Sequence, residues 1–221
     1  GNGVILKGGS EANFTNIAIS SALQEGLNKA GLDDNAICLL TSREESMAML
    51  NLEKIINLII PRGSNELVKF IQENTRIPVL GHADGICHLF IDKEANLEMA
   101  LSVALDSKIQ YPAACNALET LLIHKDIAPV FLERAIPLFE SNNVNLLGDK
   151  KSLALGVKSE ANYEDWKTEY LDLILSIKIV DHLDEAITHV QEYSSKHTDG
   201  IITDNLRSAK KFMNEVNSSG V

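Results

Sequence analysis

The sequence predicts an α/β fold built on a doubly wound parallel sheet with helices on both faces. Short apolar runs alternate along the chain with longer helical patterns, which is typical of strands joined by crossover helices. The run at residues 55–60, Ile-Ile-Asn-Leu-Ile-Ile, is almost entirely apolar, as a central parallel strand requires. With 221 residues, 45% of them hydrophobic, the chain can bury a sizeable core.

The first part of the chain repeats a strand–helix pattern. Lys7-Gly8-Gly9-Ser10 and Pro61-Arg62-Gly63-Ser64 join two of the strands to the helices that follow. Ser10 is placed to cap the first helix, and Gly31 to end it in the left-handed conformation. The strands are expected at 4–6, 36–40 and 55–60, and the helices at 11–30, 43–50 and 65–74.

The second part continues with Rossmann-like units of the same kind. Pro137 lies inside a helical pattern and is expected to end or kink that helix. Residues 150–168 lack a clear period and predict a loop with one short element. A change of character at Tyr111-Pro112 predicts a boundary between a domain at 1–108 and a domain at 109–221. Strands are expected at 77–80, 86–91, 120–124, 144–147, 173–180 and 200–203, and helices at 94–108, 131–140, 183–193 and 205–216.

Charge and composition exclude several classes of protein. The net charge of −11, from 20 Lys and Arg against 31 Asp and Glu, argues against nucleic acid or an anionic membrane as the main partner. No apolar run approaches the ~20 residues of a membrane span, and no signal-peptide pattern opens the chain. Three unevenly spaced cysteines form no disulfide framework, which favours a reducing compartment such as the cytoplasm. Because Gly1 is not Met and the end stops where a strand could start, we expect a segment truncated at both ends.

Cys115 differs from the other two cysteines in its surroundings. It lies among small residues just after Pro112, where a ligand can approach a thiol closely, whereas Cys38 and Cys87 lie inside apolar strand patterns. We therefore expect Cys38 and Cys87 to be buried structural residues. For Cys115, the residues alone are compatible with a structural thiol or with a nucleophile.

The two strand-to-helix junctions are candidate phosphate-binding loops. Their glycines allow close approach of the backbone to phosphate, the following helix N-terminus favours an anion, and each junction carries one cation, Lys7 or Arg62. Neither matches a Walker A or G-x-G-x-x-G motif, so for either one alone an ordinary tight turn is the simpler interpretation. His82, His88 and His124 lie on different predicted elements without metal-ligand spacing, so no metal site is expected.

Several segments, taken in order, form a specific combination of motifs. They are Gly1-Asn-Gly-Val-Ile-Leu-Lys-Gly-Gly-Ser-Glu11, Ile59-Ile-Pro-Arg-Gly-Ser64, Ile77-Pro-Val-Leu-Gly-His-Ala-Asp-Gly-Ile-Cys-His-Leu-Phe-Ile-Asp92, Tyr111-Pro-Ala-Ala-Cys-Asn-Ala-Leu-Glu-Thr-Leu-Leu-Ile-His124, Val180-x-x-Leu-Asp-Glu-Ala-Ile187 and His197-Thr-Asp-x-Ile-Ile-Thr203. Together they resemble the γ-glutamyl phosphate reductases, a branch of the aldehyde dehydrogenase superfamily. The resemblance covers essentially the whole chain but about the middle half of such an enzyme. It implies that 1–108 form part of an NADP-binding domain and 109–221 an incomplete catalytic domain.

The resemblance implies reduction of L-glutamate 5-phosphate by NADPH to L-glutamate 5-semialdehyde and phosphate, the second step of proline biosynthesis. Cys115 would be the nucleophile that attacks the acyl phosphate and carries the thioester. By the superfamily spacing, the glutamate that activates water in hydrolytic relatives falls at Gly81-His82, where the sequence has no carboxylate. A reductase that starts from an acyl phosphate needs no such base.

The resemblance also implies residues that bind NADP(H). Lys7 matches the lysine that reaches the adenine ribose. Ser10 stands where NAD-preferring relatives carry a glutamate, and the loss of that charge makes room for a 2′-phosphate. Arg62, Gly63 and Ser64 match the junction beside the pyrophosphate.

Glu169 matches the superfamily glutamate that holds the nicotinamide ribose, although a solvent-facing glutamate before a strand is an alternative interpretation. Two other functions stay open: a CoA-acylating aldehyde dehydrogenase, which would share Cys115 and the missing base, and an inactive fragment. The resemblance implies a homo-oligomer in the full-length enzyme and functional coupling to glutamate 5-kinase. It favours a stand-alone enzyme over one fused to a kinase domain.

Overall fold

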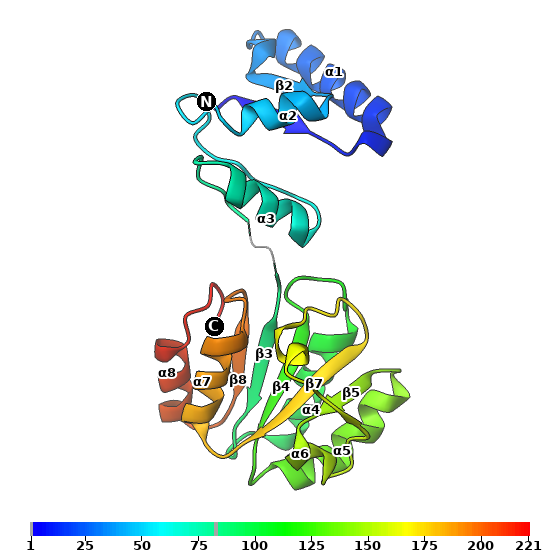
Figure 1. The fold of residues 1–221 in the computed structure, drawn as a ribbon, viewed down its shortest axis with the longest axis vertical. Coiled ribbons are helices and arrows are strands. Elements are labelled where there is room, and N and C mark those ends of the chain that lie inside the picture. The colour runs from blue at the N-terminus through cyan, green and yellow to red at the C-terminus, as the bar shows by residue number, and fades with distance from the viewer. Residues whose placement is uncertain (1, 82–83) are drawn as a thin grey trace. The chain divides into compact units, whose positions relative to one another are not determined.

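The computed structural model describes residues 2–81 and 84–221 and separates into two compact units, Gly1–Ala83 and Asp84–Val221 (Figure 1). Each unit is described by itself. The division lies earlier than the predicted boundary between residues 108 and 109, because residues 87–109 contribute a strand and a helix to the second unit. The assignment of 1–108 and 109–221 to separate functional domains stays a prediction.

The first unit contains a pair of parallel strands and the helices that follow them. β1 (Val4–Lys7) pairs with β2 (Ile37–Leu40), and α1 (Asn13–Lys29) connects them. Gly31, just past the end of α1, has a φ of 69°, which confirms the predicted left-handed stop. The remaining helices of this unit are α2 (Arg43–Met49) and α3 (Asn65–Asn74).

Ser10 does not cap α1, contrary to the prediction. A short 3-10 helix (Ser10–Ala12) precedes α1, and Ala12 occupies the N-cap position of α1. α2 begins with a capping box: Ser42 Oγ accepts a hydrogen bond from the N–H of Glu45, and the Glu45 carboxylate accepts one from the N–H of Ser42.

The two strands predicted at 55–60 and 77–80 are not present as strands in the described structure. A single isolated β-bridge between Ile59 and Val79 connects these segments. The apolar run begins as a turn, in which the N–H of Ile55 donates to a carbonyl three residues earlier. The run therefore predicts neither conformation nor burial, since Ile59 is buried but lies in no strand, while Ile55, Leu58 and Ile60 are exposed. The interpretation of 55–60 as a central strand was wrong for the described structure.

The second unit is built on a six-stranded, entirely parallel sheet with the strand order β6-β5-β7-β4-β3-β8. Strands that follow one another in the chain are joined by crossovers, as predicted for a doubly wound sheet. The strands are β3 (Cys87–Ile91), β4 (Leu118–His124), β5 (Asn145–Gly148), β6 (Ser159–Glu160), β7 (Ile174–Val180) and β8 (Asp199–Ile202).

Helices cover both faces of this sheet (Figure 1). α4 (Leu97–Ile109) and α5 (Ala128–Ser141) pack on one face, and α7 (Leu183–Tyr193) and α8 (Leu206–Glu215) pack on the other. Asparagine side chains start two of them: Asn96 accepts from the N–H of Met99 in α4, and Asn205 accepts from backbone N–H groups of α8.

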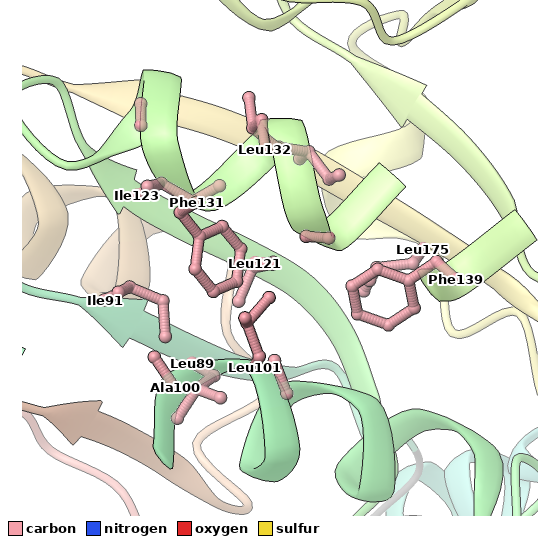
Figure 2. Packing of buried hydrophobic residues seen from close by; sticks show 14 of the residues in the cluster. Leu89, Ile91, Ala100, Leu101, Leu121, Ile123, Phe131, Leu132, Phe139 and Leu175 are labelled. Atoms are coloured by element: carbon pink, nitrogen blue, oxygen red, sulfur yellow. The ribbon is translucent and has the colours of Figure 1, made fainter. Parts of the chain in front are cut away.

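Residues of β4 fill the hydrophobic cores on both faces of the sheet. Leu121 points toward α4 and α5, where it joins Phe131, Phe139 and Leu175 (Figure 2). Leu122 belongs to the smaller cluster on the face of α7 and α8. Because burying one such side chain contributes about 1.5–3 kcal/mol, and every residue of β4 is buried, this strand is the centre of the unit.

Two segments of the second unit differ from the prediction. α5 continues through Pro137 to Ser141, so the proline does not end the helix. Proline removes one backbone donor, but the buried Phe131 and Phe139 hold the helix against the sheet on both sides of it. Residues 150–168 contain α6 (Lys150–Leu153), β6 and a 3-10 helix (Glu164–Lys167), rather than one short element.

Lys108 and Glu119 form a buried ion pair beside the larger core. The ammonium of Lys108, near the end of α4, donates to the carboxylate of Glu119 on β4 at 2.7 Å, and neither side chain is exposed. The other carboxylate oxygen of Glu119 accepts from the N–H of Leu171 at 3.3 Å, so the pair also holds the segment before β7. Burial raises the pKa of Glu119 to about 7 and lowers the pKa of Lys108, while each partner opposes the shift of the other.

Glu119→Ala would leave the Lys108 ammonium buried without a counter-charge. We expect the free energy of unfolding to fall by about 3–5 kcal/mol, the usual cost of breaking one half of a buried pair. The double variant Lys108→Met/Glu119→Leu removes both charges and should recover most of this loss. Denaturant unfolding followed by circular dichroism compares the three forms. Equal stability of Glu119→Ala and the parent protein would contradict the prediction.

Candidate active site

The predicted nucleophile lies at the amino edge of the parallel sheet in the second unit. Cys115 precedes β4, Gly85 precedes β3, Glu169 precedes β7 and His197 precedes β8. Because parallel strands run in the same direction, the residues just before them gather at one edge of the sheet. The topology therefore brings chain segments that are far apart in sequence to the surroundings of Cys115.

Cys115 lies within two consecutive tight turns. The N–H of Ala114 donates to the carbonyl of Tyr111 at 3.0 Å, and the N–H of Ala117 donates to the carbonyl of Ala114 at 2.9 Å. Cys115 itself is half-buried. The neighbouring alanines carry little side-chain bulk, so a small electrophile can reach the thiol, as nucleophilic catalysis requires.

Cys115 and Glu169 meet at Gly85. A Cβ atom on this buried glycine would lie 2.1 Å from the carbonyl oxygen of Cys115 and 2.6 Å from Oε1 of Glu169. Both distances are too short for any side chain, so the close approach of these groups requires glycine. The structure thus brings together two of the residues that the sequence predicts for the site.

Cys87 lies at the same edge of the sheet and keeps its proton. Burial raises the pKa of its thiol to about 12, and its Sγ donates to the carbonyl of Cys115 at 3.3 Å. The prediction that Cys87 is buried is confirmed. The prediction for Cys38 was wrong: Cys38 is exposed, because it points to the face of β2 opposite to Ile37 and Leu39.

The predicted residues for the adenosine end of the cofactor lie at the first helix start of the first unit. Lys7 ends β1 and is exposed, and its Nζ donates to the carbonyl of Gly8 at 2.5 Å. Ser10 opens the short 3-10 helix and is exposed. The carboxylate of Glu11 lies beside Gly9, since a Cβ there would be 2.0 Å from Oε1 of Glu11. This negative charge beside the glycine junction was not foreseen from the sequence.

The predicted residues for the pyrophosphate lie at the start of α3, also in the first unit. Ser64 is the N-cap, and its Oγ accepts from the N–H of Leu67 at 3.3 Å. Gly63 has a φ of 156°, and Arg62 is exposed. A helix N-terminus with an exposed guanidinium beside it provides a positive potential, so these residues fit an anionic group such as a pyrophosphate.

Metal-ligating side chains are not grouped in the described part of the chain. Among residues 2–81 and 84–221, no cluster of three or more His, Cys, Asp or Glu could hold a metal ion. His88 is buried with Nδ1 3.3 Å from Oδ1 of Asp199, and His124 accepts from the N–H of Asp126. His82, at the position of the missing hydrolytic base, lies outside the described residues. Over the same ranges, no helix has the length and apolar character needed to span a membrane.

The family model described as aldehyde dehydrogenase family matches residues 1–172, well over half of the chain. The chain belongs to the aldehyde dehydrogenase family. Within this family it is 82% identical over its whole length to γ-glutamyl phosphate reductase of Prochlorococcus marinus strain AS9601, and 81% identical to that of strain MIT 9301. The chain spans about half the length of these curated relatives, 51% of each.

Two solved structures confirm the predicted fold class. The crystal structure of γ-glutamyl phosphate reductase from Thermotoga maritima matches the whole chain and 54% of its own length, with a TM-score of 0.96 at 37% identity. The glyceraldehyde-3-phosphate dehydrogenase GapN from Methanocaldococcus jannaschii, solved with NADP, matches the whole chain and 57% of its own length, with a TM-score of 0.74. At 17% identity this second likeness shows the fold alone.

Sequence reasoning missed Gly85 and the contact between Cys87 and Cys115. The available signal for Gly85 was its place directly before a buried strand, where a glycine often marks the close approach of another backbone. No pattern indicated the contact of Cys87, because that contact depends on the register of β3 against β4. Family membership is consistent with the prediction that Cys115 is the nucleophile, but it identifies neither Gly85 nor Cys87 as part of the site.

Gly85→Ala tests the close packing at the nucleophile turn. The new Cβ would collide with the backbone of Cys115, so we expect a loss of about 1–3 kcal/mol in stability, typical of overpacking. Gly26→Ala in α1 is the matched control, because a Cβ there meets nothing within 4 Å. Alanine suits a helix interior better than glycine, so the control should be neutral or gain about 0.5–1 kcal/mol. Thermal unfolding compares both variants with the parent, and a Gly85→Ala protein as stable as the control would contradict the packing.

Proposed function

We propose that the enzyme containing this chain reduces L-glutamate 5-phosphate to L-glutamate 5-semialdehyde with NADPH, as the second step of proline biosynthesis. The observation that carries the proposal is the 82% identity to a γ-glutamyl phosphate reductase across all 221 residues. The fold by itself does not select a substrate, because many activities share it. The approachable Cys115 at the sheet edge supplies the chemistry that such a reaction needs.

Cys115 acts as the nucleophile in this proposal. Its thiolate attacks the acyl carbon of the substrate, the bond from that carbon to the phosphate oxygen breaks, and phosphate leaves with the electron pair. The product of this step is a thioester on Cys115. The N–H of Cys115 is available to stabilise the oxyanion of the tetrahedral intermediate, since within the described residues it donates to no backbone acceptor.

The residues that would hold NADP(H) lie at the two helix starts of the first unit and at Glu169. Arg62, Gly63 and Ser64 would bind the pyrophosphate, and Lys7 and Ser10 would face the adenine ribose. When bound, the cofactor supplies the hydride that reduces the thioester.

The two residues that meet at Gly85 have separate tasks in this proposal. Glu169 would hold the nicotinamide ribose, and its carboxylate beside the Cys115 turn supports this role. Cys115 then leaves as the thiolate when the thiohemiacetal collapses to the aldehyde. The sequence has Gly-His and no carboxylate at residues 81–82, so we expect no group there to activate water against the thioester.

The chemistry of the substrate also bears on partners and location. An acyl phosphate hydrolyses readily, so a kinase that phosphorylates glutamate must supply it close to its consumption. Functional coupling to glutamate 5-kinase therefore belongs to this proposal. The proposal also includes a homo-oligomeric state of the full-length enzyme, which the resemblance implies, and a cytoplasmic location, which the cysteine content favours.

Cys115→Ala in an enzyme with the full length of the curated relatives should abolish activity. We expect a loss of about 10⁴-fold or more, the scale seen when an enzyme loses its nucleophile. The measurement is NADPH formation from semialdehyde and NADP⁺ in the presence of phosphate, with Cys38→Ala as the control that keeps parental activity. Activity of Cys115→Ala within a few-fold of the parent would refute the assignment. Turnover that requires CoA in place of phosphate would identify a CoA-acylating dehydrogenase instead.

Ser10→Glu should lower the preference for NADPH over NADH. A carboxylate at this position would repel the 2′-phosphate, a repulsion on the order of 1–2 kcal/mol, or about 5- to 30-fold in affinity. The test compares KM for both cofactors in the parent and in Ser10→Glu, with Ser10→Gln as the uncharged control. An unchanged ratio in Ser10→Glu would show that Ser10 does not face the ribose.

A further inference from the structure

We propose that Cys87 is a positioning residue for the nucleophile, because its thiol holds the peptide group of Cys115 by a hydrogen bond to the carbonyl. The inference rests on the proposed function, in which Cys115 carries the thioester. The Sγ atom of Cys87 lies 3.3 Å from the carbonyl oxygen of Cys115, and Cys87 is 3% exposed. A donor that is shielded from water in this way is not replaced by solvent.

The surroundings of Cys87 keep its thiol protonated and therefore able to donate. Burial, with the carboxylates of Asp199 and Glu119 nearby, raises the pKa of Cys87 to about 12. Nδ1 of His197 lies 4.0 Å from the sulfur. A thiolate at this position could only accept a hydrogen bond, and the carbonyl of Cys115 would then lose its donor.

An irregularity in the sheet lies at the position of this contact. Cys87 pairs with Leu118 and His88 pairs with Thr120, so the ladder between β3 and β4 skips Glu119. An extra residue in one strand of a ladder, as in a β-bulge, bends the strand locally and redirects neighbouring side chains. Here the irregularity lies directly after the pair formed by Cys87 and Leu118, and the turn that carries Cys115 ends just before Leu118.

The hydrogen bond fixes the plane of the peptide that follows the nucleophile. In a planar trans peptide the C=O and the N–H point in opposite directions. Because the carbonyl of Cys115 points toward Cys87, the N–H of Asn116 points away from β3, and Asn116 is exposed. Gly85 leaves the space for this carbonyl, since a Cβ there would lie 2.1 Å from it. Cys87 and Gly85 together set the orientation in which Cys115 meets its substrate.

The experiment compares Cys87→Ala with Cys87→Ser in the full-length enzyme. The two variants differ by one hydroxyl, which restores the donor, so they separate donation from packing. For Cys87→Ala we expect kcat to fall about tenfold, equivalent to about 1.4 kcal/mol, with KM within about twofold of the parent. Cys87→Ser should recover most of kcat. If Cys87→Ala retains kcat within twofold, or if Cys87→Ser is as slow as Cys87→Ala, the proposal is overturned.

A second measurement does not depend on the identity of the natural substrate. Acylation of Cys115 by 4-nitrophenyl acetate releases nitrophenolate in a burst, and Cys115→Ala gives the background. Slower bursts in Cys87→Ala and recovery in Cys87→Ser support the positioning role, whereas equal bursts in all three forms reject it. If the parent enzyme fails to reduce L-glutamate 5-phosphate, the proposed function fails, and the burst comparison still decides the role of Cys87.

Discussion

The buried ion pair between Lys108 and Glu119 is the constraint on which the arrangement of the site depends. Glu119 lies on β4, just after the turn that carries Cys115, and one of its carboxylate oxygens accepts from Lys108. Its second carboxylate oxygen accepts a hydrogen bond from the N–H of Leu171, which lies two residues after Glu169. Separating α4 from β4 would leave a charge unpaired in the protein interior, which costs several kcal/mol, and moving the segment before β7 would break the hydrogen bond from Leu171. The pair therefore keeps α4, β4 and the segment before β7 together, and with them the two sides of the contact at Gly85.

The site uses the edge of the sheet that simple topology rules do not favour. In open α/β sheets, ligands usually bind beyond the carboxyl ends of the strands. Cys115, Gly85 and Glu169 instead precede the strands β4, β3 and β7. At this edge the turn that carries Cys115 is held by backbone packing, by the Cys87 hydrogen bond and by the buried pair, rather than by a glycine-rich loop at a helix start. The site is thus rigid where its nucleophile is attached.

Local patterns in the sequence predicted most of the helices and the strands of the second unit. The strands expected at 86–91, 120–124 and 173–180 correspond to β3, β4 and β7, and the expected range of α7 agrees with the structure at both ends. The same signal failed at 55–60, where Ile59 is buried but lies in no strand and the neighbouring Ile55, Leu58 and Ile60 are exposed. The prediction for Cys38 failed because side chains alternate along β2, and Cys38 lies on the face opposite to Ile37 and Leu39.

For the site too, some features could be predicted from neighbouring residues in the sequence, and others depend on contacts between distant parts of the chain. The small residues around Cys115 were a local signal, and they indicated an approachable thiol. Gly85, the donor Cys87 and the anchor Glu119 depend on which strands pair and in what register, which the sequence does not express locally. The resemblance to known reductases supplied the candidate roles of Cys115 and Glu169, and neither follows from spacing alone.

The pairing of β4 has a consequence for the order in which the protein matures on the ribosome. β4 pairs with β3, which precedes it in the chain, but its other neighbour, β7, begins only at Ile174. A nascent chain that ends before β7 already carries the thiol of Cys115, yet it lacks the strand that closes one side of β4 and the helices α7 and α8 that cover its second face. Long-range parallel pairing of this kind forms slowly, and the unpaired edge is exposed meanwhile. Cys115 is therefore synthesised well before Glu169 and β7, and during that interval its turn lies next to an open strand edge.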